Sequence, residues 1–160
     1  MKVLIAEDDI SSRALRVQVI KKTGYDVVET ADGKAAWEKL RNLHAPRLAI
    51  LDWMMPGMDG LEVIRRVRAL KTEKPPYLIL LTAKGGQSDI ITGLETGADD
   101  YLAKPFDVGV LLARMDVGRR LIEMQDALIR SREALTHQAT HDPLTGLLNR
   151  RAILDHLQRE

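Results

Sequence analysis

The sequence predicts an α/β fold in which helices cover a doubly wound, five-stranded parallel sheet. Short apolar runs alternate with longer amphipathic segments along the first two thirds of the chain. Several of these runs are continuously apolar, which is typical of strands that are buried on both faces of a parallel sheet. The connections between runs and amphipathic segments are short, as repeated βα units require.

Five runs are predicted as strands: KVLIA (2–6), DVVETA (26–31), RLAIL (47–51), YLILLT (77–82) and DYLAK (100–104). Four helices are predicted between them, at 11–22, 33–43, 59–70 and 87–96. Each helix is followed by a residue that disfavours its continuation. In order, these residues are Gly24, Pro46, the pair Pro75-Pro76, and Gly97.

A fifth helix is predicted to begin after Asp107, which we expect to be its N-cap. Residues 108–140 contain no proline, and their last glycine is Gly118. Positions with a three–four spacing follow, which is the repeat of a coiled coil. They are the apolar Val117, Leu121, Met124, Leu128 and Leu135, with polar Ser131 and Gln138 between them. Two interpretations remain open. Residues 107–140 are either a long terminal helix that lies against its own domain, or a dimerising linker helix that projects from the sheet.

Composition excludes several classes of protein. The chain has 160 residues, 45% hydrophobic content and no cysteine, so disulfides and thiolate metal sites are excluded. No apolar segment approaches the ~18 residues of a membrane span. A formal net charge of +1 argues against non-specific nucleic-acid binding. We therefore expect a cytoplasmic protein that engages neither membrane nor nucleic acid.

Polar side chains follow four of the predicted strands. Glu7 and Asp8 come after the first strand, Asp52 after the third, Thr82 at the end of the fourth and Lys104 at the end of the fifth. The carboxyl ends of parallel strands meet at one edge of the sheet, where such folds bind ligands. Each residue also has an ordinary structural explanation. Asp8 or Asp9 can cap a helix, and Asp52 can begin a turn. Thr82 can be an ordinary strand residue, and Lys104 can be a lysine at the rim of the sheet. Together they indicate a site.

The charges of this group point to a divalent cation. Three adjacent carboxylates repel one another, and Lys104 alone leaves two negative charges in excess. Carboxylate oxygens are preferred ligands of Mg²⁺, which also binds phosphate oxygens. The site is therefore suited to phosphoryl transfer, with Asp52 as a carboxylate nucleophile.

Four motifs, EDD, LDWMMPGMDG, LLTA and DDYLAKPF, closely resemble those of receiver domains of two-component response regulators. The resemblance covers residues 1–120. It implies a flavodoxin-like sheet of order 2-1-3-4-5. It also implies that Asp52 accepts a phosphoryl group from a sensor histidine kinase or a phosphotransfer protein.

The resemblance also assigns roles to the other residues. Asp8, Asp52 and the main-chain carbonyl of Met54 would bind Mg²⁺ directly, and Glu7 would contact the ion through a water molecule. Thr82 and Lys104 would contact the phosphoryl group, and Tyr101 would be the aromatic switch residue. The Lys104–Pro105 bond is expected to be cis. Met54 and Lys84 are expected to flank the path of the hydrolytic water.

The tail carries a second resemblance. HDPLTGLLNRR (141–151) is similar to the start of a GGDEF diguanylate cyclase domain. The matching residues are Asp142, Leu144, Thr145, Leu147, Asn149 and Arg150. The GG(D/E)EF signature itself is absent, since Gly85-Gly86 is followed by Gln-Ser. We expect residues 141–160 to be the truncated start of that domain in a longer protein, so this chain cannot itself synthesise cyclic di-GMP.

The leading interpretation is a phosphorylation-activated receiver whose homodimerisation controls a C-terminal diguanylate cyclase. The chain itself would have no activity beyond phosphorylation and dephosphorylation at Asp52. One alternative is a stand-alone receiver that acts by binding another protein. A second is a haloacid-dehalogenase-like phosphatase, which needs an acid where this sequence has Met54. We identify no helix-turn-helix for DNA binding in residues 121–160.

Overall fold

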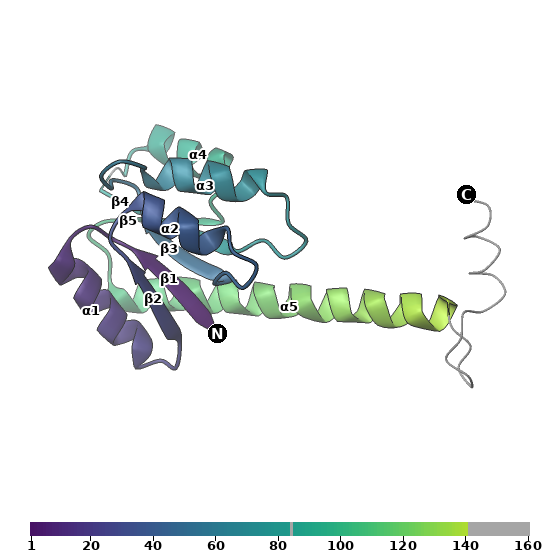
Figure 1. Ribbon diagram of the computed structural model, residues 1–160. Coiled ribbons are helices and arrows are strands. Elements are labelled where there is room, and N and C mark those ends of the chain that lie inside the picture. The colour runs from purple at the N-terminus through teal and green to yellow at the C-terminus, as the bar shows by residue number, and fades with distance from the viewer. Residues whose placement is uncertain (84, 141–160) are drawn as a thin grey trace. The chain divides into compact units, whose positions relative to one another are not determined.

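The computed structural model describes residues 1–83 and 85–140, in which strands and helices alternate (Figure 1). The strands are β1 (Lys2–Ala6), β2 (Asp26–Thr30), β3 (Leu48–Asp52), β4 (Tyr77–Thr82) and β5 (Asp100–Ala103). The helices are α1 (Ile10–Lys21), α2 (Gly33–Leu40), α3 (Gly60–Ala69), α4 (Gln87–Thr96) and α5 (Val108–Thr140).

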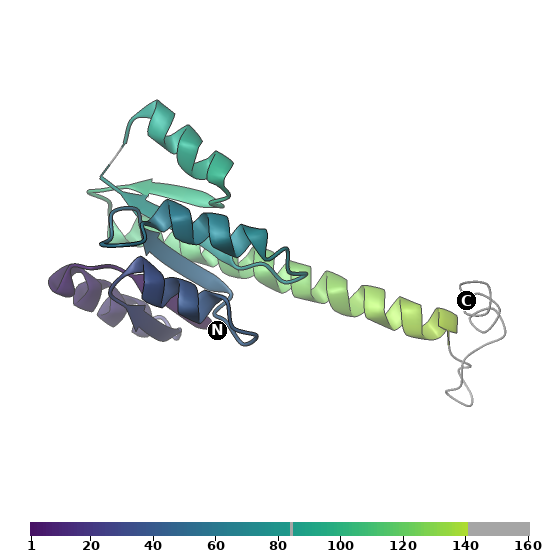
Figure 2. The ribbon, with the colours of Figure 1, turned by 45° about the horizontal axis from the view of Figure 1, so that its top comes forward.

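The strands form one parallel sheet of order β2-β1-β3-β4-β5. Helices α2, α3 and α4 cover one face, and α1 and α5 cover the other (Figures 1 and 2). Each face has its own hydrophobic core. Ala36, Leu61 and Ile64 pack into the first, and Ile20 and Leu111 pack into the second. The predicted fold class and strand order are confirmed.

Local sequence sets most of the helix boundaries. Asp9, Asp32 and Asp59 are the N-caps of α1, α2 and α3, and each carboxylate accepts a hydrogen bond from the main-chain N–H three residues later. The predicted end of the second helix at residue 43 is wrong, because α2 ends at Leu40 and a turn joins the Ala45 N–H to the Asn42 carbonyl. Asp52 is the last residue of β3 rather than the residue after it.

Helix α5 begins as predicted, and the Asp107 carboxylate accepts a hydrogen bond of 2.6 Å from the Gly109 N–H. The chain divides into two compact units, Met1–Ile122 and Glu123–Glu160. Within the first unit α5 packs closely on the sheet, because a Cβ atom on Gly118 would lie only 2.5 Å from Cδ1 of Tyr77. Among the described residues, no helix has both the length and the apolar character needed to span a bilayer.

The predicted coiled-coil positions of α5 face solvent. The apolar residues Val117, Leu121, Met124, Leu128 and Leu135 are all exposed. A different face of the helix supplies Leu111, Met115 and Ile122 to the core of the first unit. The described chain therefore carries an unpartnered apolar stripe on α5. The GGDEF-like motif at 141–151 lies outside the described residues.

Candidate functional site

Three parallel strands deliver polar residues to one edge of the sheet. Asp52 ends β3 and is in register with Leu81 of β4, next to Thr82. The Lys104 N–H donates to the Thr82 carbonyl at 2.7 Å, which holds the end of β5 beside β4. Asp52 and Thr82 are buried, whereas the Lys104 side chain is partly exposed.

The acids after β1 join Asp52 in a cluster. Glu7, Asp8 and Asp52 each offer a carboxylate oxygen, and these oxygens lie within 4.8 Å of one another. The Asp9 carboxylate instead accepts a hydrogen bond of 2.7 Å from the Ser12 N–H as the cap of α1. The sequence left open which of Asp8 and Asp9 caps the helix, and Asp9 does so. Asp8 is exposed at the cluster.

Lys104 lies between two of these carboxylates. Its Nζ is 2.7 Å from Asp52 Oδ2 and 3.5 Å from Glu7 Oε2. Sequence reasoning counted Lys104 as the only cation at the site, but the Arg16 guanidinium also pairs with Glu7. Lys104 and Arg16 are the two cations paired with the three carboxylates, which leaves an excess of one negative charge rather than two.

Helix α1 supplies the cations that sequence reasoning missed. Arg13 donates a hydrogen bond of 2.8 Å to the main-chain carbonyl of Glu7. The Arg16 guanidinium also lies 5.5 Å from the centre of the Phe106 ring. A spacing of three residues places Arg13 and Arg16 on one face of a helix that starts directly after the acids. That spacing is the sequence signal that identifies them.

The two buried carboxyls titrate in opposite directions. Burial raises the pKa of Asp52 to about 6, and the neighbouring Glu7 adds to this increase while Lys104 opposes it. Burial also acts to raise the pKa of Glu7, but a hydrogen bond with Asp52 and the charges of Arg16 and Lys104 outweigh it, so this pKa is lowered. Of the two carboxyls, Asp52 therefore keeps its proton to the higher pH.

Thr82 and Tyr101 lie on the same face of the sheet. The Thr82 side chain is fully buried. Burial raises the pKa of Tyr101, and the nearby Thr82 side chain acts against that rise. The Tyr101 hydroxyl is buried and makes no hydrogen bond of ordinary geometry within the described residues. Its ring packs against α4, where a Cβ atom on Gly93 would lie 3.2 Å from Tyr101 Cδ2.

The remaining predicted residues lie at the rim or outside the described residues. The Met54 side chain is 60% exposed. The Lys104–Pro105 peptide bond is cis. Lys84 lies outside the described residues. Gly60 is a further residue that sequence reasoning missed: a Cβ atom there would overlap the main-chain carbonyl of Asp52. The close approach of α3 to the end of β3 therefore requires glycine at this position.

Residues 3–116 match the family described as the response regulator receiver domain. The chain belongs to that family. The haloacid-dehalogenase alternative is thereby set aside. The receiver is 36% identical over 118 residues to the chemotaxis protein CheY1 of Helicobacter pylori, a match that spans 73% of this chain and 95% of that protein.

Two solved structures show how the receiver compares in three dimensions. The receiver domain of a Francisella response regulator is 33% identical, with a TM-score of 0.67 over 72% of this chain and 93% of the other. A probable two-component system response regulator/GGDEF domain protein is 25% identical, with a TM-score of 0.71. That match spans 77% of this chain and 50% of the longer protein.

Proposed function

We propose that this receiver is switched by phosphorylation of Asp52. The observation that carries the proposal is the contact between Asp52 and Lys104 inside a cluster of three carboxylates, in a chain of the receiver family. A buried carboxylate with one cationic neighbour at the end of a rigid strand is well placed as a nucleophile. Receiver domains interact with histidine kinases or phosphotransfer proteins, which would supply the phosphoryl group.

The transfer step requires an oxygen of Asp52 to attack phosphorus. The new oxygen–phosphorus bond forms as the bond between phosphorus and a histidine nitrogen of the partner protein breaks. The electron pair of the broken bond stays on that histidine. Lys104, now 2.7 Å from Asp52 Oδ2, would then pair with a phosphoryl oxygen.

The donor set fits Mg²⁺. Asp8, Asp52 and the Met54 main-chain carbonyl would hold the ion, which when bound neutralises charge on phosphoryl oxygens. Glu7 would act through a water molecule. The pairing of Glu7 with Arg16 and Lys104 supports this indirect role, because its carboxylate is already engaged by two cations.

The response to phosphorylation would pass through Thr82 and Tyr101. Thr82 would donate a hydrogen bond to the phosphoryl group, and Tyr101 would change its side-chain conformation as Thr82 shifts. The proximity of the two side chains supports this coupling. Met54 and Lys84 would flank the path of the hydrolytic water and set the lifetime of the phosphoryl group.

The output would be a diguanylate cyclase controlled by homodimerisation. Two observations support this: the GGDEF-like motif at 141–151, and the similarity to the solved structure of a probable response regulator/GGDEF domain protein. The exposed apolar stripe on α5 suits a coiled coil between two copies. A stand-alone receiver is the second candidate, because the match to CheY1 spans nearly all of that protein.

Phosphate labelling tests the site. With a small-molecule phosphodonor and Mg²⁺, the chain should acquire acid-stable, base-labile phosphate. Asp52→Ala should abolish the label, and chelation of Mg²⁺ should do the same. Asp26→Ala, which alters an exposed carboxylate at the start of β2, is the matched control and should label normally. Labelling of Asp52→Ala to the wild-type extent would refute the assignment.

A further inference from the structure

Glu7 lies close enough to Asp8 and Asp52 to bind the same metal ion directly. Each of the three side chains offers a carboxylate oxygen, and these oxygens lie within 4.8 Å of one another. Asp8 is exposed, whereas the Glu7 side chain is only 3% exposed. Attraction between a carboxylate and a divalent cation is strongest where water is excluded, so burial by itself favours direct binding by Glu7. An indirect role for Glu7 therefore needs a contact that opposes this attraction.

Both oxygens of the Glu7 carboxylate already have partners. Oε1 accepts a hydrogen bond of 3.4 Å from the Asp9 N–H, and Oε2 pairs with the Arg16 guanidinium. Oε2 also lies 3.5 Å from Nζ of Lys104, but that Nζ is closer to Asp52 Oδ2, at 2.7 Å. In the proposed reaction Lys104 would pair with a phosphoryl oxygen. Arg16 would then be the remaining cation on Glu7 within the described residues.

The Arg16 side chain is itself held in place. It is only 13% exposed, and its Cζ lies 5.5 Å from the centre of the Phe106 ring. Phe106 in turn packs against the core that α1 and α5 share with the sheet. The main chain of Glu7 is fixed from the same helix, because Arg13 donates to its carbonyl at 2.8 Å. Helix α1 therefore holds both the backbone and the carboxylate of Glu7.

The number of protein ligands influences which cation a site prefers. Mg²⁺ keeps several waters and is usually bound through one or two carboxylates, whereas Ca²⁺ takes about six to eight oxygen ligands in a flexible geometry. With Glu7 held by Arg16, the carboxylates left for direct binding are Asp8 and Asp52. Two carboxylates suit Mg²⁺, and a third bound directly would favour Ca²⁺.

We propose that Arg16 determines the cation specificity of this site by keeping Glu7 out of direct contact with the metal. The inference rests on the proposed magnesium-dependent phosphorylation of Asp52. Arg16 is a positioning residue, because it acts through the Glu7 carboxylate. Its positive charge also weakens the attraction of the site for every divalent cation. The charge acts on Mg²⁺ and Ca²⁺ alike, whereas the positioning of Glu7 changes the ratio of the two affinities.

The ratio of Ca²⁺ affinity to Mg²⁺ affinity is therefore the quantity to measure. Trp53, which follows Asp52 and is buried, offers a fluorescence signal for titrations at pH 8. Arg16→Met should raise the affinity for both ions, because it removes a positive charge. The gain for Ca²⁺ should exceed the gain for Mg²⁺ by about tenfold, since Ca²⁺ accepts the released Glu7 carboxylate as an additional ligand.

Two single variants control for charge and for general effects of substitution. Arg16→Lys keeps a cation beside Glu7 and should leave the ratio close to that of the parent chain. Arg66→Met is the matched control, because Arg66 pairs with Glu62 at 3.0 Å on an exposed face of α3. It should change neither affinity. If Arg16→Met does not fold, as judged by thermal unfolding, Arg16→Gln removes the same charge with a polar side chain and makes the same comparison.

A double variant shows whether the effect passes through Glu7. Adding Glu7→Gln to Arg16→Met should remove the preferential gain for Ca²⁺, because the carboxylate that Arg16 restrains is then absent. Equal changes in both affinities, or a gain for Ca²⁺ that survives Glu7→Gln, would overturn the inference and leave the proposed phosphorylation site standing. A parent chain that binds neither ion at millimolar concentration would overturn the proposed metal site, and this inference with it.

Discussion

Asp52 and Glu7 are neighbouring carboxyls whose pKa values are shifted in opposite directions. Arg16 and Lys104 help to keep Glu7 ionised. Burial raises the pKa of Asp52 to about 6, and the charge of Glu7 adds to this rise. Because the Asp52 pKa in the folded chain lies above the value of 3.8 for an unperturbed group, folding favours its protonated form. Without metal, the contribution of Asp52 to the free energy of unfolding is therefore lost as the pH rises from about 4 to about 6.

Mg²⁺ binding should depend on pH through the same group. A proton on Asp52 competes with the cation, so apparent affinity for Mg²⁺ should be about tenfold lower at pH 5 than above pH 7. Trp53, adjacent to Asp52 in the chain and buried, offers a fluorescence signal for the titration. Affinity that does not change between pH 5 and pH 7.5 would contradict the raised pKa of Asp52.

A substitution at Met54 tests whether this one side chain controls the lifetime of the phosphoryl group. A thioether is a weak hydrogen-bond acceptor and no donor, so Met54 orients a water molecule poorly. Met54→Asn should therefore accelerate loss of phosphate from Asp52, measured by the decay of the label after the donor is removed. Because Met54 is 60% exposed, the substitution should leave thermal stability nearly unchanged. A rate equal to or below that of the parent chain would exclude water positioning by this side chain.

Helix α5 combines two apolar faces in one element. One face packs in the core through Leu111, Met115 and Ile122, and the other exposes the stripe that includes Leu121 and Leu128. Gly118 lies where the buried face meets Tyr77 at the start of β4. A side chain at that position cannot be accommodated without displacing the tyrosine ring, so the glycine sets how closely α5 approaches the sheet.

Gly118→Ala should accordingly destabilise the chain. Alanine favours a helix over glycine by about 1 kcal/mol, but overpacking against Tyr77 costs roughly 1–3 kcal/mol. We expect a net loss in the free energy of unfolding, measured by urea denaturation. Gly85→Ala is the control, because its Cβ atom would meet Ala103 at an ordinary 3.7 Å. A stabilised Gly118→Ala chain would mean that α5 can move away from β4 at little cost.

At the scale of the whole molecule, the proposed signal must travel from Asp52 to an output beyond the described residues. Helix α5 contains residues of both compact units, on either side of Ile122. Its exposed stripe keeps a seven-residue repeat from Val117 to Leu135, the spacing of a coiled-coil seam. If two copies pair along this stripe, a rotation at the receiver changes the relative orientation of whatever follows.

Insertions near Ser131 in the full-length protein test this transmission. Seven added residues preserve the phase of the seam and should retain most of the phosphorylation-dependent cyclase activity. Two added residues rotate the following chain by roughly 200° and should abolish or lock the response. Similar activity of both variants would show that the helix serves as a tether. Independently, a phosphate mimic with Mg²⁺ should raise the dimer fraction of the present chain in sedimentation.

The sequence alone determined the fold class, the strand order implied by resemblance, and the group of polar residues at the strand ends. This was possible because these features depend on local patterns: apolar runs, caps such as Asp107, and the rule that parallel strands end at one edge. The four motifs added the roles of Asp52, Thr82 and Lys104, which remain predictions until they are tested.

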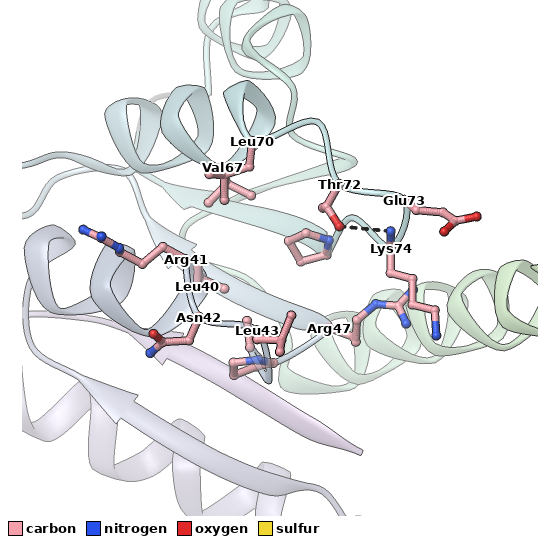
Figure 3. A pocket seen from close by; sticks show the side chains of 13 residues that line it. Leu40, Arg41, Asn42, Leu43, Arg47, Val67, Leu70, Thr72, Glu73 and Lys74 are labelled. Carbon is pink, nitrogen blue, oxygen red and sulfur yellow. Dashed lines mark hydrogen bonds between the residues drawn. The ribbon is translucent and has the colours of Figure 1, made fainter. Parts of the chain in front are cut away.

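Tertiary structure decided the features that depend on contacts between distant segments. Only packing shows that Asp9 rather than Asp8 caps α1, that Arg16 pairs with Glu7, and that Gly60 lies against Asp52. The pocket lined by the α2–β3 and α3–β4 segments (Figure 3) likewise arises because two loops far apart in sequence enter neighbouring strands. A linear pattern records which face of a segment is apolar, but the neighbour of that face is set by the three-dimensional arrangement of all the elements.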